Sequence, residues 1–204
     1  MKIILASASP RRKELLGLIT KDFEVITAEV DERKIEEEVI KSEADSDFKT
    51  KASDLTVCLA EAKAKAVYEM LSKEDKEETL VIGADTCVVT DDEILGKPED
   101  EEDARRMLLN LSGMTHSVIT GVSIITRDKK ISFAEESLVT FNDDDAYQRA
   151  LIEKYVQTKD PYDKAGAYGI QSGGALLVKK IEGDYFNIVG LPVCSLARNL
   201  CEVW

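Results

Sequence analysis

The chain has 204 residues, 44% of them hydrophobic and 33% charged, which is typical of one substantial globular domain or two small lobes. Its 27 lysines and arginines face 40 acidic residues, and the net charge of -13 argues against binding to a nucleic acid polymer through a basic face. A small anionic substrate held by a few local cations remains compatible with this charge. No CxxC pair or zinc-finger spacing is present, and Cys58 and Cys87 are expected to be buried small hydrophobes. No stretch reaches transmembrane length and the N-terminal apolar run is too short for a signal peptide, so we expect a cytoplasmic protein that binds no membrane.

The first predicted strand, residues 2–6, leads into a hydroxyl-rich turn and a helix. Ser9 fits the N-cap of this helix and Gly17 its C-terminal stop. The helix start also carries Arg11 and Arg12. Free backbone N–H groups, the helix dipole and two guanidinium groups together favour an anion site. The alternative is a capped surface helix with two solvated arginines.

A second strand is predicted over residues 23–26, followed by the acidic stretch 29–38. Most of these carboxylates are expected on the solvated face of a helix. One of Glu29, Asp31 and Glu32 could reach a metal ion, and their spacing does not distinguish them.

The next segment, residues 41–53, lacks apolar periodicity and is expected to be an exposed loop or a loosely held helix. Residues 55–71 follow with apolar side chains at three- and four-residue spacing, which predicts an amphipathic helix. Lys63 and Lys65 lie among small alanines, so the helix can pack closely on a sheet while a lysine reaches over the sheet end. Surface solubility is the alternative role for either lysine.

The strand predicted over residues 80–89 contains the most informative carboxylate of the chain. Gly83 and Ala84 are too small to fill a core layer, so a ligand or another backbone should approach the strand there. Asp85 follows them within an apolar run, and an unpaired buried carboxylate is unfavourable. Asp85 is therefore either neutralised by a partner or held in a cleft for chemistry.

The second half of the chain alternates further strands and helices. Strands are expected at residues 94–95, 116–126 and 130–141, helices at 100–111, 143–155 and 194–203, and a hairpin of strands at 176–181 and 185–189. Lys97 precedes a proline and is therefore held in an extended conformation. His116 is the single histidine, and a structural role is favoured over that of a general base.

Residues 160–171 form a second stretch with dense chemistry. Two glycines allow a backbone to approach a ligand closely, and Asp163, Lys164 and Gln171 add a carboxylate, a cation and a bidentate amide. Neither a core segment nor a generic linker has this composition.

Seven blocks of the chain carry a family resemblance. They are residues 7–12, 59–64, 83–86, 96–98, 111–113, 163–171, and 183–185 together with 190–192. With these blocks in this order the chain resembles the Maf (septum-formation) family of nucleoside triphosphate pyrophosphatases, almost from end to end.

The resemblance implies an α/β fold with an elongated mixed β-sheet flanked by helices, and two lobes with a central cleft, similar to the inosine triphosphatase fold. Residues 1–204 are then a single domain. The implied activity is a house-cleaning hydrolysis of nucleoside triphosphates to the monophosphate and pyrophosphate. It implies a divalent cation, Mg or Mn, that is not bound by a dedicated all-protein site, and a possible homodimer.

Arg11, Thr86 and Gln171 match the positions of the branch that prefers dTTP and UTP, so the resemblance implies that these three residues set substrate specificity. The substrate could also be a modified pyrimidine nucleotide. An amide such as that of Gln171 offers a donor and an acceptor to the O4/N3–H edge of thymine or uracil.

Hydrolysis at the α-phosphorus needs a base for water and cations that neutralise the phosphates. Asp85 is the expected catalytic base, acting directly or through metal-bound water. The expected phosphate-binding side chains are Ser7, Ser9, Arg11, Arg12, Lys63, Lys97 and Lys164. The metal ligands are expected among Asp85, Asp163 and Asp31. The alternatives are a non-catalytic nucleotide-binding regulator of cell division, a phosphatase that removes the terminal phosphate, and, least favoured, a scaffold.

Overall fold

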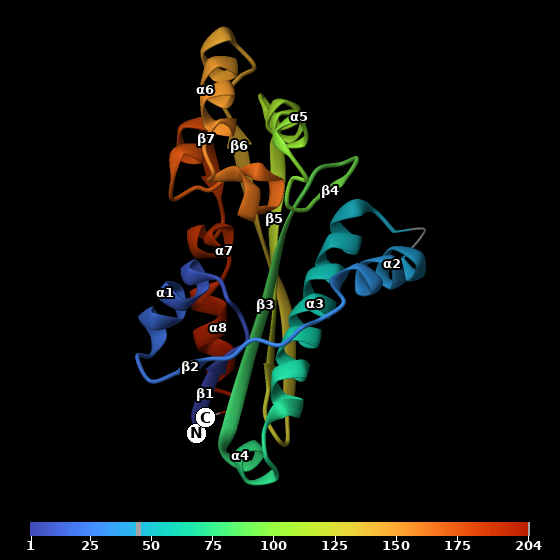
Figure 1. Ribbon diagram of the computed structural model, residues 1–204, viewed down its shortest axis with the longest axis vertical. Helices are drawn as coiled ribbons and strands as arrows, with labels where there is room; N and C mark the ends of the chain where they lie inside the picture. The colour runs from blue at the N-terminus through green and yellow to red at the C-terminus, as the bar shows by residue number, and fades with distance from the viewer. Residues whose placement is uncertain (44–45, 204) are drawn as a thin grey trace.

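The computed structural model describes residues 1–43 and 46–203. It is an elongated α/β structure built on one mixed seven-stranded sheet with helices on both faces (Figure 1). The strands are β1 (Lys2–Leu5), β2 (Glu24–Val25), β3 (Thr79–Val89), β4 (Ile94–Leu95), β5 (Thr115–Ile125), β6 (Lys130–Phe141) and β7 (Val178–Glu182). The helices are α1 (Pro10–Ile19), α2 (Glu32–Ser42), α3 (Phe48–Met70), α4 (Lys73–Glu78), α5 (Glu101–Leu111), α6 (Ala146–Val156), α7 (Tyr185–Val189) and α8 (Val193–Leu200). This architecture confirms the predicted fold class.

The central strand β3 connects the parallel and antiparallel parts of the sheet. The strand order is β2-β1-β3-β5-β6-β7, with β4 paired to the end of β3. β1 runs parallel to β3, and β5 runs antiparallel to it from Val81 opposite Ile125 to Val89 opposite Ser117. β5 and β6 then form a long antiparallel pair that gives the molecule its length (Figure 1). The strand expected over residues 80–89 is therefore confirmed.

Alternation along β3 sends successive side chains to different helices. Leu80 and Ile82 pack with residues of α1 and α8, whereas Val81 packs with Ala64 and Val67 of α3. The α3 side of the sheet is exceptionally close to its helix, because a Cβ built on Gly83 would lie 2.2 Å from the carbonyl oxygen of Ala60. The close approach expected at Gly83 is thus made by another backbone.

Two hydrophobic clusters lie toward opposite ends of β3. One includes Val88 with buried side chains of α5 and α6, and the other includes Leu80 with buried side chains of α1 and α8. The helices α5 and α6 lie near one end of the molecule, and α1 and α8 lie further along the sheet (Figure 1). The helix expected over residues 100–111 is confirmed as α5, whose buried residues are Ala104, Met107, Leu108 and Leu111. The two clusters correspond to the two expected lobes.

The hairpin expected near the C-terminus is wrong in its second strand, because residues 185–189 form the short helix α7. The Asp184 side chain caps this helix by accepting from the Phe186 amide, and Gly190 ends it with a φ of 123°. Asn187 then donates to the carbonyl of Val118 at 3.0 Å. An apolar run of five residues does not distinguish a buried helix turn from a strand by its pattern alone.

Three smaller expectations also need correction. Gly17 lies inside α1, which continues to Ile19. Cys58 is exposed, because it lies on the outer side of α3, whereas Cys87 is buried as expected. The segment 41–53 contains the end of α2 and the start of α3, and α3 begins at Phe48 behind an Asp47 N-cap. Residues 44–45, part of the same prediction, lie outside the described residues. Within residues 1–43 and 46–203, none of the helices is long and apolar enough to cross a membrane.

Candidate active site

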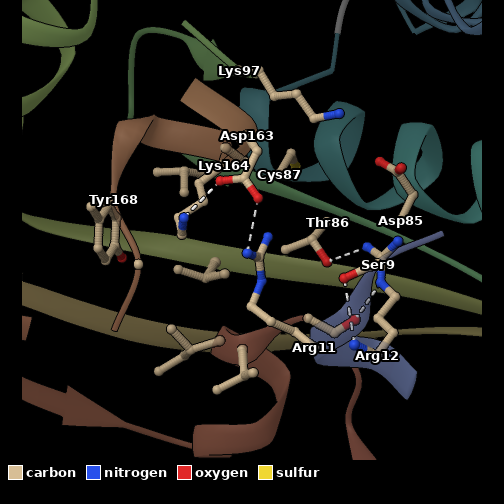
Figure 2. A pocket seen from close by; sticks show the side chains of 18 of the residues that line it. Ser9, Arg11, Arg12, Asp85, Thr86, Cys87, Lys97, Asp163, Lys164 and Tyr168 are labelled. Atoms are coloured by element: carbon tan, nitrogen blue, oxygen red, sulfur yellow. Dashed lines mark hydrogen bonds and ion pairs between the residues drawn. The ribbon is translucent and has the colours of Figure 1, made fainter. Parts of the chain in front are cut away.

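A cleft of about 680 Å³ opens between the two lobes, beside the middle of β3. Its walls come from the start of α1, from α2 and α3, and from the segments 94–99, 160–172 and 188–190. Most of the side chains expected to carry chemistry lie in this lining: Ser9, Arg11, Arg12, Lys63, Asp85, Thr86, Lys97, Asp163, Lys164 and Gln171. Figure 2 shows several of them, among them Arg12, Asp85 and Asp163. The fold thus brings together residues that are up to 162 positions apart, from Ser9 to Gln171.

Asp85 is on the face of β3 that points toward α3, as Gly83 is. Its Oδ1 accepts a hydrogen bond from Lys63 Nζ at 2.6 Å. The same ammonium contacts Glu32 Oε1 at 2.7 Å. Lys63 and Asp85 each keep 18% of the side chain exposed, so the pair is shielded but open to the cleft. The two alternatives given for Asp85 are thus not exclusive, because its carboxylate has a cationic partner and also faces the cleft.

The acidic stretch of α2 contributes Glu32 to the lining, and Asp31 lies outside it. Asp31 is the N-cap of α2 and accepts from the Lys34 amide at 3.1 Å. Glu32 is the first residue of the helix, and its side chain reaches Lys63. The sequence left Glu29, Asp31 and Glu32 as alternatives, and the helix phase brings Glu32 to the cleft.

Arg12 ties the start of α1 to β3 and to the loop after α7. Its Nη2 donates to Thr86 Oγ1 at 2.9 Å, and its Nε donates to the Gly190 carbonyl at 2.8 Å. Burial lowers the pKa of Arg12, and the charge of Asp85 acts in the opposite direction. The guanidinium has five N–H donors, so groups remain for a ligand.

The two serines before α1 have different positions. Ser9 lines the cleft and caps α1, with its Oγ accepting from the Arg12 amide at 3.4 Å. Ser7 is buried and lies outside the lining, where its Oγ accepts from the Ser9 amide at 3.3 Å and from Arg12 Nη1 at 3.4 Å. Ser7 is therefore placed to orient the turn and the arginine.

A chain of alternating charges links Arg11 of α1 to the 160–164 segment across the cleft. Arg11 Nη1 contacts Asp163 Oδ2 at 3.0 Å, and Lys164 Nζ contacts Asp163 Oδ1 at 2.6 Å (Figure 2). Burial alone would raise the pKa of Asp163, but the hydrogen bonds from Lys164 and Arg11 outweigh it and hold the pKa below its usual value. Lys164 also contacts Asp160 Oδ1 at 2.9 Å. These contacts cross the cleft from α1 to the 160–164 segment.

Lys97 and Gln171 line the cleft and are both exposed. Neither makes a side-chain hydrogen bond to another of the described residues. His116 lies outside the lining and is 2% exposed, with its Nε2 2.8 Å from the Tyr168 hydroxyl. Burial lowers the pKa of His116 to about 4. This placement supports the structural role expected for the histidine.

The carboxylates around Asp85 could take part in binding a divalent cation. Among the described residues, no three His, Cys, Asp or Glu side chains are grouped closely enough to hold a metal ion. Asp85 and Glu32 nevertheless converge on one ammonium, which marks a position where two carboxylates stabilise positive charge. Mg²⁺ is commonly held by one or two carboxylates together with substrate phosphates. The pair therefore fits a cation that is shared with a phosphate ligand.

Comparison with known proteins places the chain in a family. A family model described as Maf-like protein matches residues 2–203. A dTTP/UTP pyrophosphatase of Bacillus cereus is 45% identical over 199 residues, which cover 98% of this chain and 94% of that protein. One of Bacillus velezensis is 46% identical over 204 residues, with 98% and 96% covered. Among solved structures, the Ham1 protein of Staphylococcus aureus has a TM-score of 0.39 and 16% identity, over 70% of this chain and 73% of that one. The family match spans nearly the whole chain, and the resemblance seen in the seven blocks is confirmed: the chain belongs to the Maf family.

Proposed function

We propose that this protein hydrolyses dTTP and UTP to the nucleoside monophosphate and pyrophosphate. The observation that carries the proposal is the cleft itself, in which Asp85 lies among cationic side chains from α1, α3 and the 160–172 segment. The names of the two Bacillus relatives support the choice of substrates. A triphosphate needs this combination of a base and several cations.

Asp85 is the proposed general base. Lys63 occupies its Oδ1, so Oδ2 is the atom left to accept a hydrogen bond from water. The water oxygen attacks the α-phosphorus as its proton passes to Asp85, and the bond between the α-phosphorus and the bridging oxygen breaks. The electron pair of that bond leaves with pyrophosphate. Proton transfer to a positioned base of this kind typically contributes about 10²–10⁴-fold to the rate.

The cations that line the cleft are proposed to bind the phosphates and to neutralise their charge. Lys63 contacts Asp85, and the charge of Asp85 acts on Arg12, so these two cations would face the α-phosphate. The exposed Lys97 would follow the β- and γ-phosphates. Ser9 and the N–H groups at the start of α1 would bind phosphate oxygens, because the helix N-terminus favours anions. Ser7 would act indirectly, through its contacts with Ser9 and Arg12.

A divalent cation, Mg or Mn, would be held by Asp85 and Glu32 together with the phosphates, and the Lys63 ammonium, which lies between the two carboxylates, would then turn to the phosphates. When bound, such an ion neutralises phosphate charge and lowers the pKa of a water ligand. Asp163 is a weaker candidate because Arg11 and Lys164 already neutralise it, and Asp31 lies outside the lining.

Base selection is proposed for Arg11, Thr86 and Gln171. The Gln171 amide can match the O4/N3–H edge of uracil or thymine with a donor and an acceptor. The same amide, if turned over, would match cytosine. An amide turns over by rotation about its own Cγ–Cδ bond, so selectivity for uracil depends on the orientation of this amide, and the backbone position of Gln171 sets where the amide meets the base.

The deciding experiment is a product assay across the common nucleoside triphosphates with Mg²⁺ or Mn²⁺, in which pyrophosphate and orthophosphate are resolved. Pyrophosphate released chiefly from dTTP and UTP supports the proposal. Orthophosphate as the only product indicates a terminal phosphatase. Nucleotide binding without turnover indicates the non-catalytic regulator.

A cytoplasmic location and a homodimer also belong to the proposal. All four cysteines are free, which suits a reducing compartment. The homodimer is proposed from the family resemblance, and light scattering would detect it as a mass twice the 22.6 kDa of the chain.

A further inference from the structure

A polar network centred on Asp160 lies in the wall of the cleft that carries Gln171, and Asp160 and Ser172 themselves line the cleft. The Asp160 carboxylate accepts hydrogen bonds from the Tyr155 hydroxyl and from Ser172 Oγ, the latter at 2.5 Å. Its other oxygen accepts from Lys164 Nζ at 2.9 Å. Burial alone would raise the pKa of Asp160, but these bonds outweigh it and hold the pKa below its usual value. The mechanism above assigns no role to Asp160, Tyr155 or Ser172.

The network reaches both backbone groups of Gly169. The Gly169 amide donates to the Tyr155 hydroxyl at 3.1 Å. The Gly169 carbonyl accepts from the Ser172 amide at 3.3 Å and lies 3.1 Å from Ser172 Oγ. Gln171 lies between these two anchored residues, so its backbone position depends on the side chains that end on Asp160.

Packing restricts the same turn from the other side. A Cβ built on Gly169 would lie 2.5 Å from Lys164 Cε and 2.7 Å from Ser172 Oγ, and one built on Gly174 would lie 2.8 Å from the Gly169 amide nitrogen. Real Cβ atoms essentially never come so close. The turn therefore has little space in which to shift.

Lys164 belongs to this support. Only 10% of its side chain is exposed, and its ammonium contacts the Asp160 carbonyl, the Asp160 carboxylate and Asp163 Oδ1 at 2.5, 2.9 and 2.6 Å. An ammonium has three N–H donors, and three acceptors already use them. A phosphate would have to displace one of these acceptors to reach Lys164.

We propose that Asp160, together with Tyr155 and Ser172, is a positioning group that holds residues 169–172 so that Gln171 meets the substrate base in one register. The inference rests on the proposed function, because it assigns a role to the support of the base-reading residue. Asp160 itself touches no substrate in this scheme and acts only through the turn.

The test compares Tyr155→Phe with Tyr147→Phe. Both substitutions remove one hydroxyl from α6, but Tyr147 is 72% exposed and lies away from the network. Two quantities are measured: the hydrogen exchange of a fragment that covers residues 165–175, and the ratio of kcat/KM for UTP to that for CTP. Melting temperatures confirm that each variant is folded.

We expect Tyr155→Phe to speed exchange at Gly169 and to reduce the UTP/CTP ratio by about three- to tenfold, the range of one net hydrogen bond. The loss should appear mainly as a higher KM for UTP, with kcat nearly unchanged, whereas Tyr147→Phe should match the wild type. Ser172→Ala also removes one hydroxyl group from the network, so it should likewise speed exchange and reduce the UTP/CTP ratio.

Unchanged exchange in Tyr155→Phe and Ser172→Ala would overturn the proposal, and so would faster exchange with an unchanged UTP/CTP ratio. An equal effect in Tyr147→Phe would also overturn it. A wild-type protein that does not prefer UTP would instead refute the proposed function, and the selectivity role would fall with it. The two failures are distinguished by the wild-type ratio.

Discussion

The contact between α3 and β3 is tight enough that one added methyl group should disturb both stability and activity. In Gly83→Ala the new Cβ would lie 2.2 Å from the Ala60 carbonyl oxygen and 2.9 Å from the Ala64 amide nitrogen, where ordinary contact begins at 3.4 Å. The helix must therefore retreat by more than 1 Å, because neither neighbour is a flexible side chain. Overpacking of this kind destabilises a protein by about 1–3 kcal/mol. In a chain of this length that corresponds to a fall in melting temperature of roughly 3–10 °C.

The same retreat would move Lys63, which lies between Ala60 and Ala64 on the helix and contacts Asp85. Misplacement of a catalytic group by about 1 Å can reduce the rate by about 100-fold. Urea unfolding followed by circular dichroism and kcat/KM for UTP measure the two effects. Gly17→Ala is the matched control, because its Cβ would meet only Lys21 Nζ at 3.5 Å within helix α1. That control should gain up to about 1 kcal/mol of stability. If Gly83→Ala unfolds within about 0.5 kcal/mol of the wild type and keeps its activity, the steric reasoning is refuted.

Four other predictions concern Asp85, Gln171, His116 and the divalent cation. Asp85→Asn should reduce kcat by at least about 100-fold while calorimetry still detects nucleotide binding, and near-normal turnover would exclude Asp85 as the base. Gln171→Glu should lower the preference for UTP with little change in melting temperature because Gln171 is exposed, and an unchanged substrate ratio would count against base reading. Burial lowers the pKa of His116 from 6.5 to about 4. Between pH 6.5 and pH 4 the unfolded chain therefore binds a proton at His116 that the folded protein does not bind. The free energy of unfolding should fall by up to about 3 kcal/mol as the pH drops from 6.5 to 4. His116→Gln should flatten that part of the pH profile of urea unfolding, and an identical slope in both proteins would contradict the assignment. Chelation with EDTA should stop turnover without changing the melting temperature of the nucleotide-free protein, since the described residues contain no group of three metal-ligating side chains; a large drop in melting temperature would indicate a structural metal.

The elements that depend on local pattern could be predicted from the sequence. The strand around Asp85 follows from an apolar run, and the strand over residues 130–141 follows from alternation, with Ser137, Val139 and Phe141 on one side. The Ser9 cap follows from its position before Pro10. Helix α7 could not be recognised, because its five residues are also compatible with a strand and its identity is fixed by the Asp184 cap and the turn at Gly190. Pattern and capping compete over such short segments, and the tertiary contacts decide.

The membership of the cleft could be predicted more fully than its internal contacts. The pairing of Lys63 with both Glu32 and Asp85 depends on the phase of α2 and on the packing of α3 against β3, and neither is visible in the spacing of charges. Tyr155 and Ser172 carried no signal, because a tyrosine in an amphipathic helix and a serine beside glycines are common. Asp31 was expected near the metal, but a residue at the N-cap turns its carboxylate to its own helix.

The pairing of cations with carboxylates inside the cleft has a consequence for binding and release. Lys63, Lys164 and Arg11 each already hold an acidic side chain of this chain. A triphosphate that enters must exchange places with these internal counter-ions, so its affinity is the difference between two sets of ion pairs. These three cations are therefore already neutralised in the absence of a ligand, whereas Arg12 bonds only to neutral acceptors among the described residues and Lys97 is exposed. In the proposed reaction the carboxylates would return to their partners as pyrophosphate departs, and they would compete with this product for the same cations.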